Sequence, residues 1–344
     1  LREVQATGDA ATVVAAATDL RRRLDEARTI LAAGRDADGR LAARLAGGRG
    51  SLLAAEADLA VGRGLDALAC LGLPPGQAAA AGFGPAISAA DPVVADAAAD
   101  LAVRAILAAF TAGPGESADA GRLRAVIEQA ATASPRAATA LVRELARRVE
   151  ASATAVRVAD LDGDPTRTVH AAPLPEDPTD PLVLLATGLE AWLAATSDSS
   201  AAPPAVLAIA RRELGRLAIA AGRFAQARAW FDAVGGLQSA DPGVLLGAAD
   251  ARVLATEADS DAEELAAAMA AYRRLVAGRE AAGPVRWWTA QLRMLQILDR
   301  TGRNTEAIGP RIERLRLDDP TFGDPRLRAA FESLAARHAA PPSP

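Results

Sequence analysis

The clearest structural signal lies in residues 204–242, which read PAVLAIARRELGRLAIAAGRFAQARAWFDAVGGLQSADP. Ala and Leu dominate this stretch and both favour helices, whereas the β-branched and aromatic residues that favour strands are few. The stretch therefore favours helices, and it contains small residues and aromatic residues at intervals. The small residues Gly215 and Ala227 would let these helices approach each other, and we expect Phe231 to fill the gap to the next pair.

Helix starts of one form recur along the chain and extend this prediction to all of it. An Asp or Ser followed by Pro precedes an apolar-periodic stretch at Asp91-Pro92, Ser134-Pro135, Asp180-Pro181, Asp241-Pro242 and Asp324-Pro325. The side-chain oxygen can accept a bond from an N–H of the first turn, and Pro at the first helical position loses no needed donor. The composition agrees, since 51% of the 344 residues are hydrophobic but only 3% are aromatic. We therefore predict an all-α protein.

Breaks in the helical pattern divide the chain into three regions. Residues 1–155 form an N-terminal helical region, with helices expected near 9–33, 36–46, 51–71, 92–112, 118–132 and 135–155 and a loop rich in Pro and Gly at 73–90. Residues 156–180 form a linker, in which a short hairpin across Gly163-Asp164 is one alternative. Residues 181–344 form a second helical block.

The C-terminal block resembles the tetratricopeptide family of helical repeats. Its best copy has Leu214-Gly215 in the first helix, Gly222 at the turn, and Ala227 and Phe231 on the second helix. The second copy has Leu246-Gly247, Ala268, Tyr272 and Leu275, and the third has Gly302 at the turn, Ala307 on its second helix and Arg311 where an aromatic residue is expected. The alanines of the three copies are 41 and 39 residues apart, against a family period of about 34, and insertions at 256–264 and 279–284 accommodate the excess.

This resemblance covers residues 204–320 and implies a solenoid of helical hairpins. Residues 322–338 would then be a C-terminal capping helix with Leu327, Phe331 and Leu334 facing inward. The aromatic residues gather after residue 180, and we expect most of them to lie in the core between helix pairs.

The resemblance also implies a binding face, because the first helix of each pair lines a concave groove that holds peptides in this family. Arg212 and Arg216 lie one turn apart on the first helix of the best copy, and Arg293 and Gln296 of the third copy would lie nearby. Guanidinium groups hold carboxylates through charge-assisted bonds, so we expect a groove for an acidic segment or a free C-terminus. The alternative is ordinary ion pairing with neighbours such as Glu213.

Charge and loop motifs argue against several other classes. The net charge of -5 differs from the basic surplus of a general nucleic-acid binder. No apolar run reaches the roughly 18 residues of a membrane span. Asp160, Asp162 and Asp164 alternate as calcium ligands do, but the sixth and twelfth positions of such a loop are Pro165 and Ala171, which favours an acidic turn.

The remaining reactive residues do not form a recognisable site. Cys70 is the only cysteine, and its apolar surroundings predict a buried thiol. Neither histidine, His170 or His338, has a partner at zinc spacing, so we expect no metal and no cofactor. The glycine-rich residues 47–51 lack the Lys of a phosphate loop and predict a helix cap. Glu190 beside Trp192 is the one pair that invites a glycosidase interpretation, and few other aromatic residues could line a sugar.

The pattern as a whole predicts a non-enzymatic protein–protein interaction scaffold that binds a peptide or partner protein in a concave helical groove. A structural subunit of a larger, self-assembling complex is the alternative, and an all-α enzyme is the third class. All 38 cationic residues are Arg, which suggests a GC-rich, bacterial genome. The chain begins at Leu1, and removal of a signal peptide is one expectation, which leaves the compartment open between cytoplasm and export.

Overall fold

The structure is a computed structural model that describes residues 9–33, 35, 39–46, 48–71, 73, 91–111, 117–159, 169–196, 202–256 and 262–338. Within these ranges the regular elements are all helices, without a single β-strand. The all-α prediction is therefore confirmed for the part of the chain that the structure describes. The acidic turn at 160–164 and the hairpin expected across Gly163-Asp164 lie outside these ranges, as does most of the loop expected at 73–90.

The chain folds as two compact units. Unit 1 comprises Leu1–Leu145 and Pro175–Leu207, and unit 2 comprises Ala146–Leu174 and Ala208–Pro344. Of the expected linker 156–180, the described residues 156–159 and 169–174 belong to unit 2, and residues 175–180 belong to unit 1.

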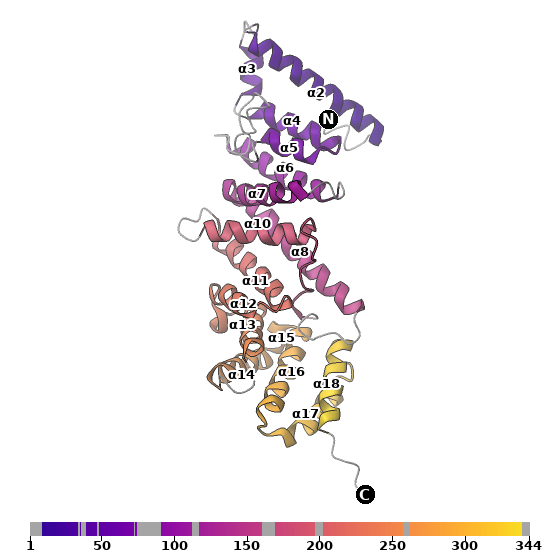
Figure 1. Cartoon of the computed structure of the whole chain (residues 1–344), viewed down its shortest axis with the longest axis vertical. Coiled ribbons are helices and arrows are strands. Elements are labelled where there is room, and N and C mark those ends of the chain that lie inside the picture. Colours follow the sequence, from indigo (N-terminus) through magenta and orange to yellow (C-terminus); the bar gives the residue numbers. More distant parts are fainter. Residues whose placement is uncertain are drawn as a thin grey trace. The chain divides into compact units, whose positions relative to one another are not determined.

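Unit 1 is built from helices that pack in pairs (Figure 1). Its helices are α2 (Ala10–Ala32), α3 (Arg40–Leu45), α4 (Arg49–Ala60), α5 (Gly64–Leu71), α6 (Pro92–Thr111), α7 (Ser117–Ala133) and α10 (Pro181–Ala195), with the first part of α8 (Pro135–Ala159) and the start of α11 (Pro204–Ala220). The packed pairs include α4 with α5, α2 with α4 and α7 with α10. Helix α7 packs on α10 through Gly188, where a Cβ atom would lie 2.7 Å from Cγ2 of Ile127. The small residue therefore sets how closely these two helices approach.

The prediction of a single helix at 51–71 is wrong, because the structure divides this stretch into α4 and α5. Gly62 between them has a φ of +79°, in the left-handed region that favours glycine. The N–H of Arg63 then bonds the carbonyl oxygen of Asp58 at 2.9 Å, which closes the end of α4. Gly62 was the sequence signal for this break. The apolar periodicity continues on both sides of it, and so the sequence did not indicate that one helix ends and another begins there.

The predicted helix starts are confirmed. Each capping side chain accepts a bond from the backbone N–H of the first turn: Asp91 from Val93, Ser134 from Ala137, Asp180 from Leu182, Asp241 from Gly243 and Asp324 from Arg326. The expected cap in the glycine-rich stretch is also present, since Gly48 is the N-cap of α4 with a φ of 83°. Local side-chain chemistry therefore determines where these helices begin.

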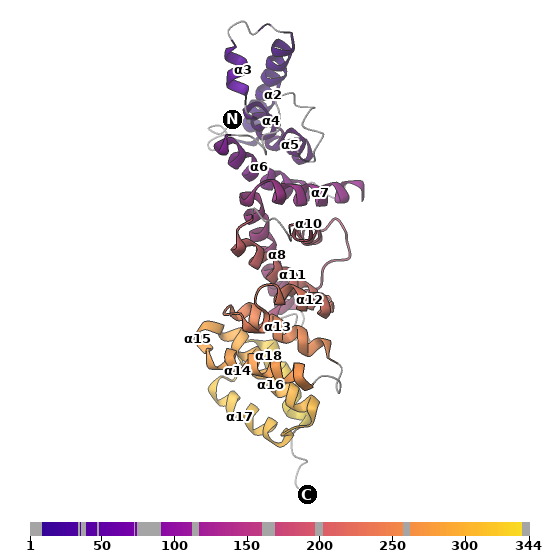
Figure 2. The ribbon, with the colours of Figure 1, turned by 90° about the vertical axis from the view of Figure 1, so that its left-hand side faces the viewer.

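Unit 2 contains the residues of the repeat-like pattern. After the ends of α8 and α11 it has α12 (Phe224–Asp232), η2 (Gly236–Gln238), α13 (Pro242–Ala255), α14 (Ala262–Ala277), α15 (Arg279–Ala282), α16 (Pro284–Thr301), η3 (Thr305–Ala307), α17 (Ile308–Asp318) and α18 (Pro325–Arg337). Two perpendicular views show α13, α14 and α16 side by side (Figures 1 and 2).

Phe231 lies where the small residues were expected to leave room for it. Its ring is fully buried, and Cβ atoms built at Gly215 of α11 and Gly247 of α13 would lie 2.8 Å and 2.2 Å from ring carbons. Ala227, one turn before Phe231, is also fully buried. The ring therefore packs between the helix before it and the helix after it.

One position of the third copy differs from the expectation. Gly302 does form the turn, with a φ of 64°, but Ala307 ends the 3-10 helix η3 and is the N-cap of α17 rather than part of it. Ile308, the next residue, is fully buried instead. The short 3-10 segment after Asn304 shifts the helix start by a residue or two, which a periodicity cannot detect.

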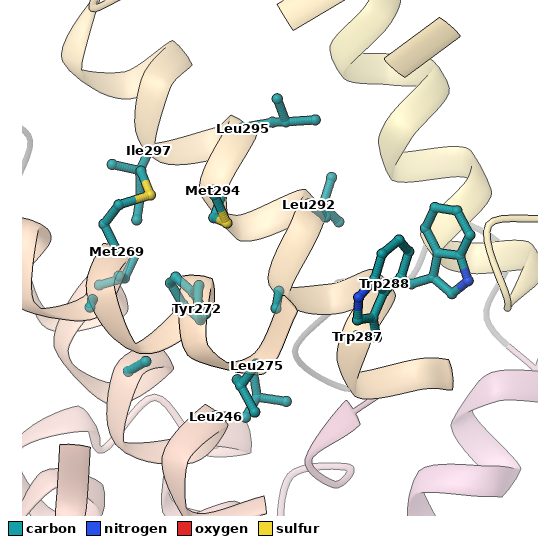
Figure 3. Close-up of a cluster of buried hydrophobic side chains, with 14 of the residues drawn as sticks. Leu246, Met269, Tyr272, Leu275, Trp287, Trp288, Leu292, Met294, Leu295 and Ile297 are labelled. Carbon is teal, nitrogen blue, oxygen red and sulfur yellow. The ribbon is translucent and has the colours of Figure 1, made fainter. Parts of the chain in front are cut away.

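Aromatic side chains form the core at the C-terminal end of unit 2, as expected for most of them. Trp287 and Trp288 of α16 meet edge to face at a centroid distance of 4.6 Å (Figure 3). Trp288 also meets the ring of Phe322 at 5.6 Å, and Phe322 stacks on Phe331 of α18 at 4.5 Å. The expected C-terminal helix is present as α18, with Leu327, Phe331 and Leu334 buried, although Phe322 precedes it with a φ of 50°.

Candidate functional site

A carboxylate without solvent exposure lies at the centre of unit 2. Asp250 of α13 is 0% exposed. Its Oδ1 accepts bonds from the hydroxyl of Tyr272 at 2.5 Å and from Nε of Arg293 at 3.2 Å. Its Oδ2 is 2.7 Å from Nε2 of His170, which lies in the segment 169–174 of unit 2. Three donors from α14, α16 and segment 169–174 therefore converge on one carboxylate, as a buried charge requires.

The electrostatics of this cluster favour an ionised Asp250 beside a neutral His170. Burial alone would raise the pKa of Asp250, but Arg293, His170 and Tyr272 outweigh it and hold that pKa below its usual value. Burial lowers the pKa of His170, and the positive charges of Arg216 and Arg293 add to this against the opposing effect of Asp250. Burial next to Asp250 raises the pKa of Tyr272 well above its usual value. The neutral imidazole thus donates its Nε2–H to Asp250.

The predicted arginines of α11 converge on a second buried acid. Oε1 of Glu213 accepts a bond from Nε of Arg212 at 2.9 Å, and Oε2 accepts one from Nη1 of Arg216 at 2.7 Å. Arg212 also pairs with Asp241 at 3.1 Å, and Arg216 pairs with Glu150 at 3.0 Å. The ion pairing with Glu213 that was the alternative at these positions is therefore present, with Glu213 itself 0% exposed.

Arg293 and Gln296 lie together on α16. The side chain of Arg293 is more buried than that of a residue lining an open groove would be. Its side chain is 6% exposed, and its Nη1 donates to Oε1 of Gln296 at 2.9 Å while its Nε donates to Asp250. Nη2 of Arg216 reaches the carbonyl oxygen of Val169, the residue before His170, at 3.4 Å. The four predicted residues are thus parts of one polar network, joined through segment 169–174 and Asp250.

Sequence reasoning missed the residues at the centre of this network. His170 and Asp250 are 80 positions apart and have no common motif. A weak signal was present in α13, since Asp250 follows Leu246 by four residues and therefore shares an apolar helix face with it. A carboxylate on such a face requires buried donors, and the sequence does not reveal which residues provide them.

A smaller polar cluster in unit 1 surrounds the cysteine. Cys70 is buried, as expected, and its Sγ donates to Oδ2 of Asp58 at 3.4 Å. Asp58 also pairs with Arg21 and Arg63, each at 2.8 Å. Burial raises the pKa of the Cys70 thiol, opposed by the bond from Arg21. The cluster gathers two arginines and a thiol around one acid, and the thiol is withdrawn from solvent.

Three other kinds of site receive no support from the geometry. In the described ranges, His, Cys, Asp and Glu side chains do not come together in groups of three or more that could hold a metal ion. Trp192 is 0% exposed, so its indole face cannot stack on a sugar beside Glu190. A helix long and apolar enough to cross a membrane is not found among the described helices.

Comparison of the chain with protein-family models, with curated proteins and with solved structures finds no match. The chemistry of the described residues therefore carries the functional argument.

Proposed function

We propose that this chain is a non-enzymatic scaffold that binds extended segments of partner proteins. In this proposal α11 to α17 form a helical-hairpin solenoid of the tetratricopeptide type, and α18 closes its end. The packing of Phe231 between Gly215 and Gly247 supports the repeat interpretation, because these three positions carry the pattern in sequence. Repeat proteins of this kind present broad helical surfaces that suit peptides better than small substrates.

The observation that carries the proposal is a non-helical stretch of the chain held against helices of unit 2. Residues 170–175 have no regular structure, yet His170 and Ala171 are 2% and 0% exposed. Arg216 of α11 bonds the carbonyl of Val169, and Ser152 of α8 accepts a bond from the N–H of Ala172 at 3.4 Å. Helix side chains that satisfy the backbone of an irregular segment perform the task that peptide recognition requires.

The test is a selection of random linear peptides on the purified full-length chain, accompanied by mass measurement over a range of concentrations. We expect selected peptides to share a pattern and to bind a chain whose mass is independent of concentration. A mass that increases to a closed oligomer, without any enriched peptide, would contradict the scaffold and favour the structural subunit.

A further inference from the structure

A hollow lies between α16 and α17. Its arginines differ in their ion pairing from Arg212, Arg216 and Arg293, the arginines predicted to bind a ligand. The hollow has a volume of about 580 Å³, within the range of ligand sites in proteins. Its lining includes Trp287 and Gln291 of α16 and Arg311, Arg314, Leu315 and Asp318 of α17. We refer to this hollow as the α16–α17 basin.

The lining of the basin follows from helix periodicity. Arg311, Arg314, Leu315 and Asp318 stand at positions i, i+3, i+4 and i+7 of α17 and therefore share one face. Trp287 and Leu315 are each 6% exposed and provide an apolar floor. The guanidinium of Arg279 lies over the Trp287 ring at 4.3 Å, which is a cation–π contact with this floor residue.

Two cations of the basin, Arg311 and Arg314, form no ion pair within the described part of the chain. Among the residues that the structure describes, no carboxylate lies within ion-pair distance, 4.0 Å, of Arg311 or Arg314. Arg311 donates to a neutral acceptor, Oε1 of Gln291, at 3.1 Å. Arg212, Arg216 and Arg293, in contrast, each pair with a buried carboxylate. A ligand at the predicted face would have to break those pairs, whereas a ligand in the basin would not.

Acidic groups near the basin do not neutralise it. Among the described residues that line the basin, Asp318 is the one acid beside two arginines. Asp319, the next residue, accepts bonds from the N–H groups of Thr321 at 2.8 Å and Gly323 at 3.1 Å, and the positive charge of Arg279 also lowers its pKa. An apolar floor with an excess of positive charge around it is complementary to carboxylates beside an apolar side chain.

We infer that the α16–α17 basin is the docking site for an acidic segment of a partner protein, whose carboxylates pair with Arg311 and Arg314 while an apolar side chain covers Trp287 and Leu315. This inference rests on the proposed scaffold function and assigns the ligand chemistry to a different face from the one predicted by sequence.

The experiment uses fluorescence anisotropy with a labelled peptide in which pairs of Glu flank single Leu residues, and a matched peptide with Gln for Glu. The test variant is Arg311→Glu/Arg314→Glu in the full chain, with Arg314→Glu alone as a second variant, since Arg314 is exposed and its change leaves the core untouched. The matched control is Arg223→Glu/Arg273→Glu, which makes the same change of charge at exposed positions outside the basin.

We expect the Glu peptide to bind the wild type and the control alike, the double variant to bind it about tenfold more weakly or worse, and the Gln peptide not to bind. Equal binding of the two peptides, or equal binding by wild type and double variant, would overturn the inference. If the Glu peptide does not bind but randomly selected peptides do, the basin assignment fails and the scaffold stands. If neither binds, both fail.

Discussion

Phe231 occupies the space that Gly247 leaves open: a Cβ atom at position 247 would lie 2.2 Å from Cζ of the ring. The two residues belong to α12 and α13, so their contact joins the end of one predicted repeat to the start of the next. The two residues are 16 positions apart in sequence. A single methyl group added at position 247 would force the helices to separate or the ring to move.

The first prediction concerns this contact. Gly247→Ala should destabilise unit 2 by about 1–3 kcal/mol through overpacking, even though Ala favours a helix more than Gly does. Urea unfolding followed by circular dichroism measures the change. The control is Gly309→Ala in α17, where the added Cβ would meet only the carbonyl oxygen of His338 at 3.5 Å, an ordinary contact. Equal effects of the two substitutions would show that the Phe231 contact does not limit the packing.

The second prediction concerns the buried carboxylate. Asp250→Ala removes the acceptor of Tyr272, His170 and Arg293 and leaves the Arg293 charge in the core, so we expect a loss of about 3–5 kcal/mol in the free energy of unfolding. Asp318→Ala, at an exposed acid of α17, should change stability by less than about 0.5 kcal/mol. A small effect of Asp250→Ala would mean that the three donors find other acceptors.

The third prediction is a loss of stability in mild acid that depends on His170. Because the folded-state pKa of His170 lies below its ordinary value of 6.5, the unfolded chain binds more protons below that pH, and stability falls as the pH falls through 6.5. Asp250, whose pKa is also lowered, contributes a further loss only below about 3.8.

The measurement for this pH dependence is urea unfolding at pH values from about 7.5 to about 5. His170→Gln keeps an N–H donor for Asp250 but does not titrate, so its stability should vary less over this range. Identical slopes for the wild type and His170→Gln would exclude His170 as the source.

The fourth prediction concerns the thiol of Cys70. Burial raises its pKa and withdraws it from solvent, so a disulfide reagent at neutral pH should label the native chain at least about tenfold more slowly than the chain in urea. The rate is followed by absorbance of the released thiolate. Labelling of the native protein at the unfolded rate would show that the Asp58–Arg21–Cys70 cluster opens readily.

The sequence by itself determined the helical class, the helix starts at which Asp or Ser precedes Pro, and the residues of α11 to α13 that pack between helices. Caps such as Asp241 act on the N–H groups two or three residues away, and the small size of Gly215 is a property of the residue wherever it lies. Interactions of this kind involve residues close together in the chain, so they can be predicted from the sequence. It also predicted Phe231 as a packing residue and the buried face of α18.

Only the tertiary structure decided which charges meet. His170 reaches Asp250 across 80 positions, and Glu213 takes both arginines that were expected to hold a ligand. Arg311, which departs from the repeat pattern, lies instead in the basin without an acidic partner. The energy of a charge depends on its burial and on partners brought by other helices, and neither quantity is encoded within one turn of the chain.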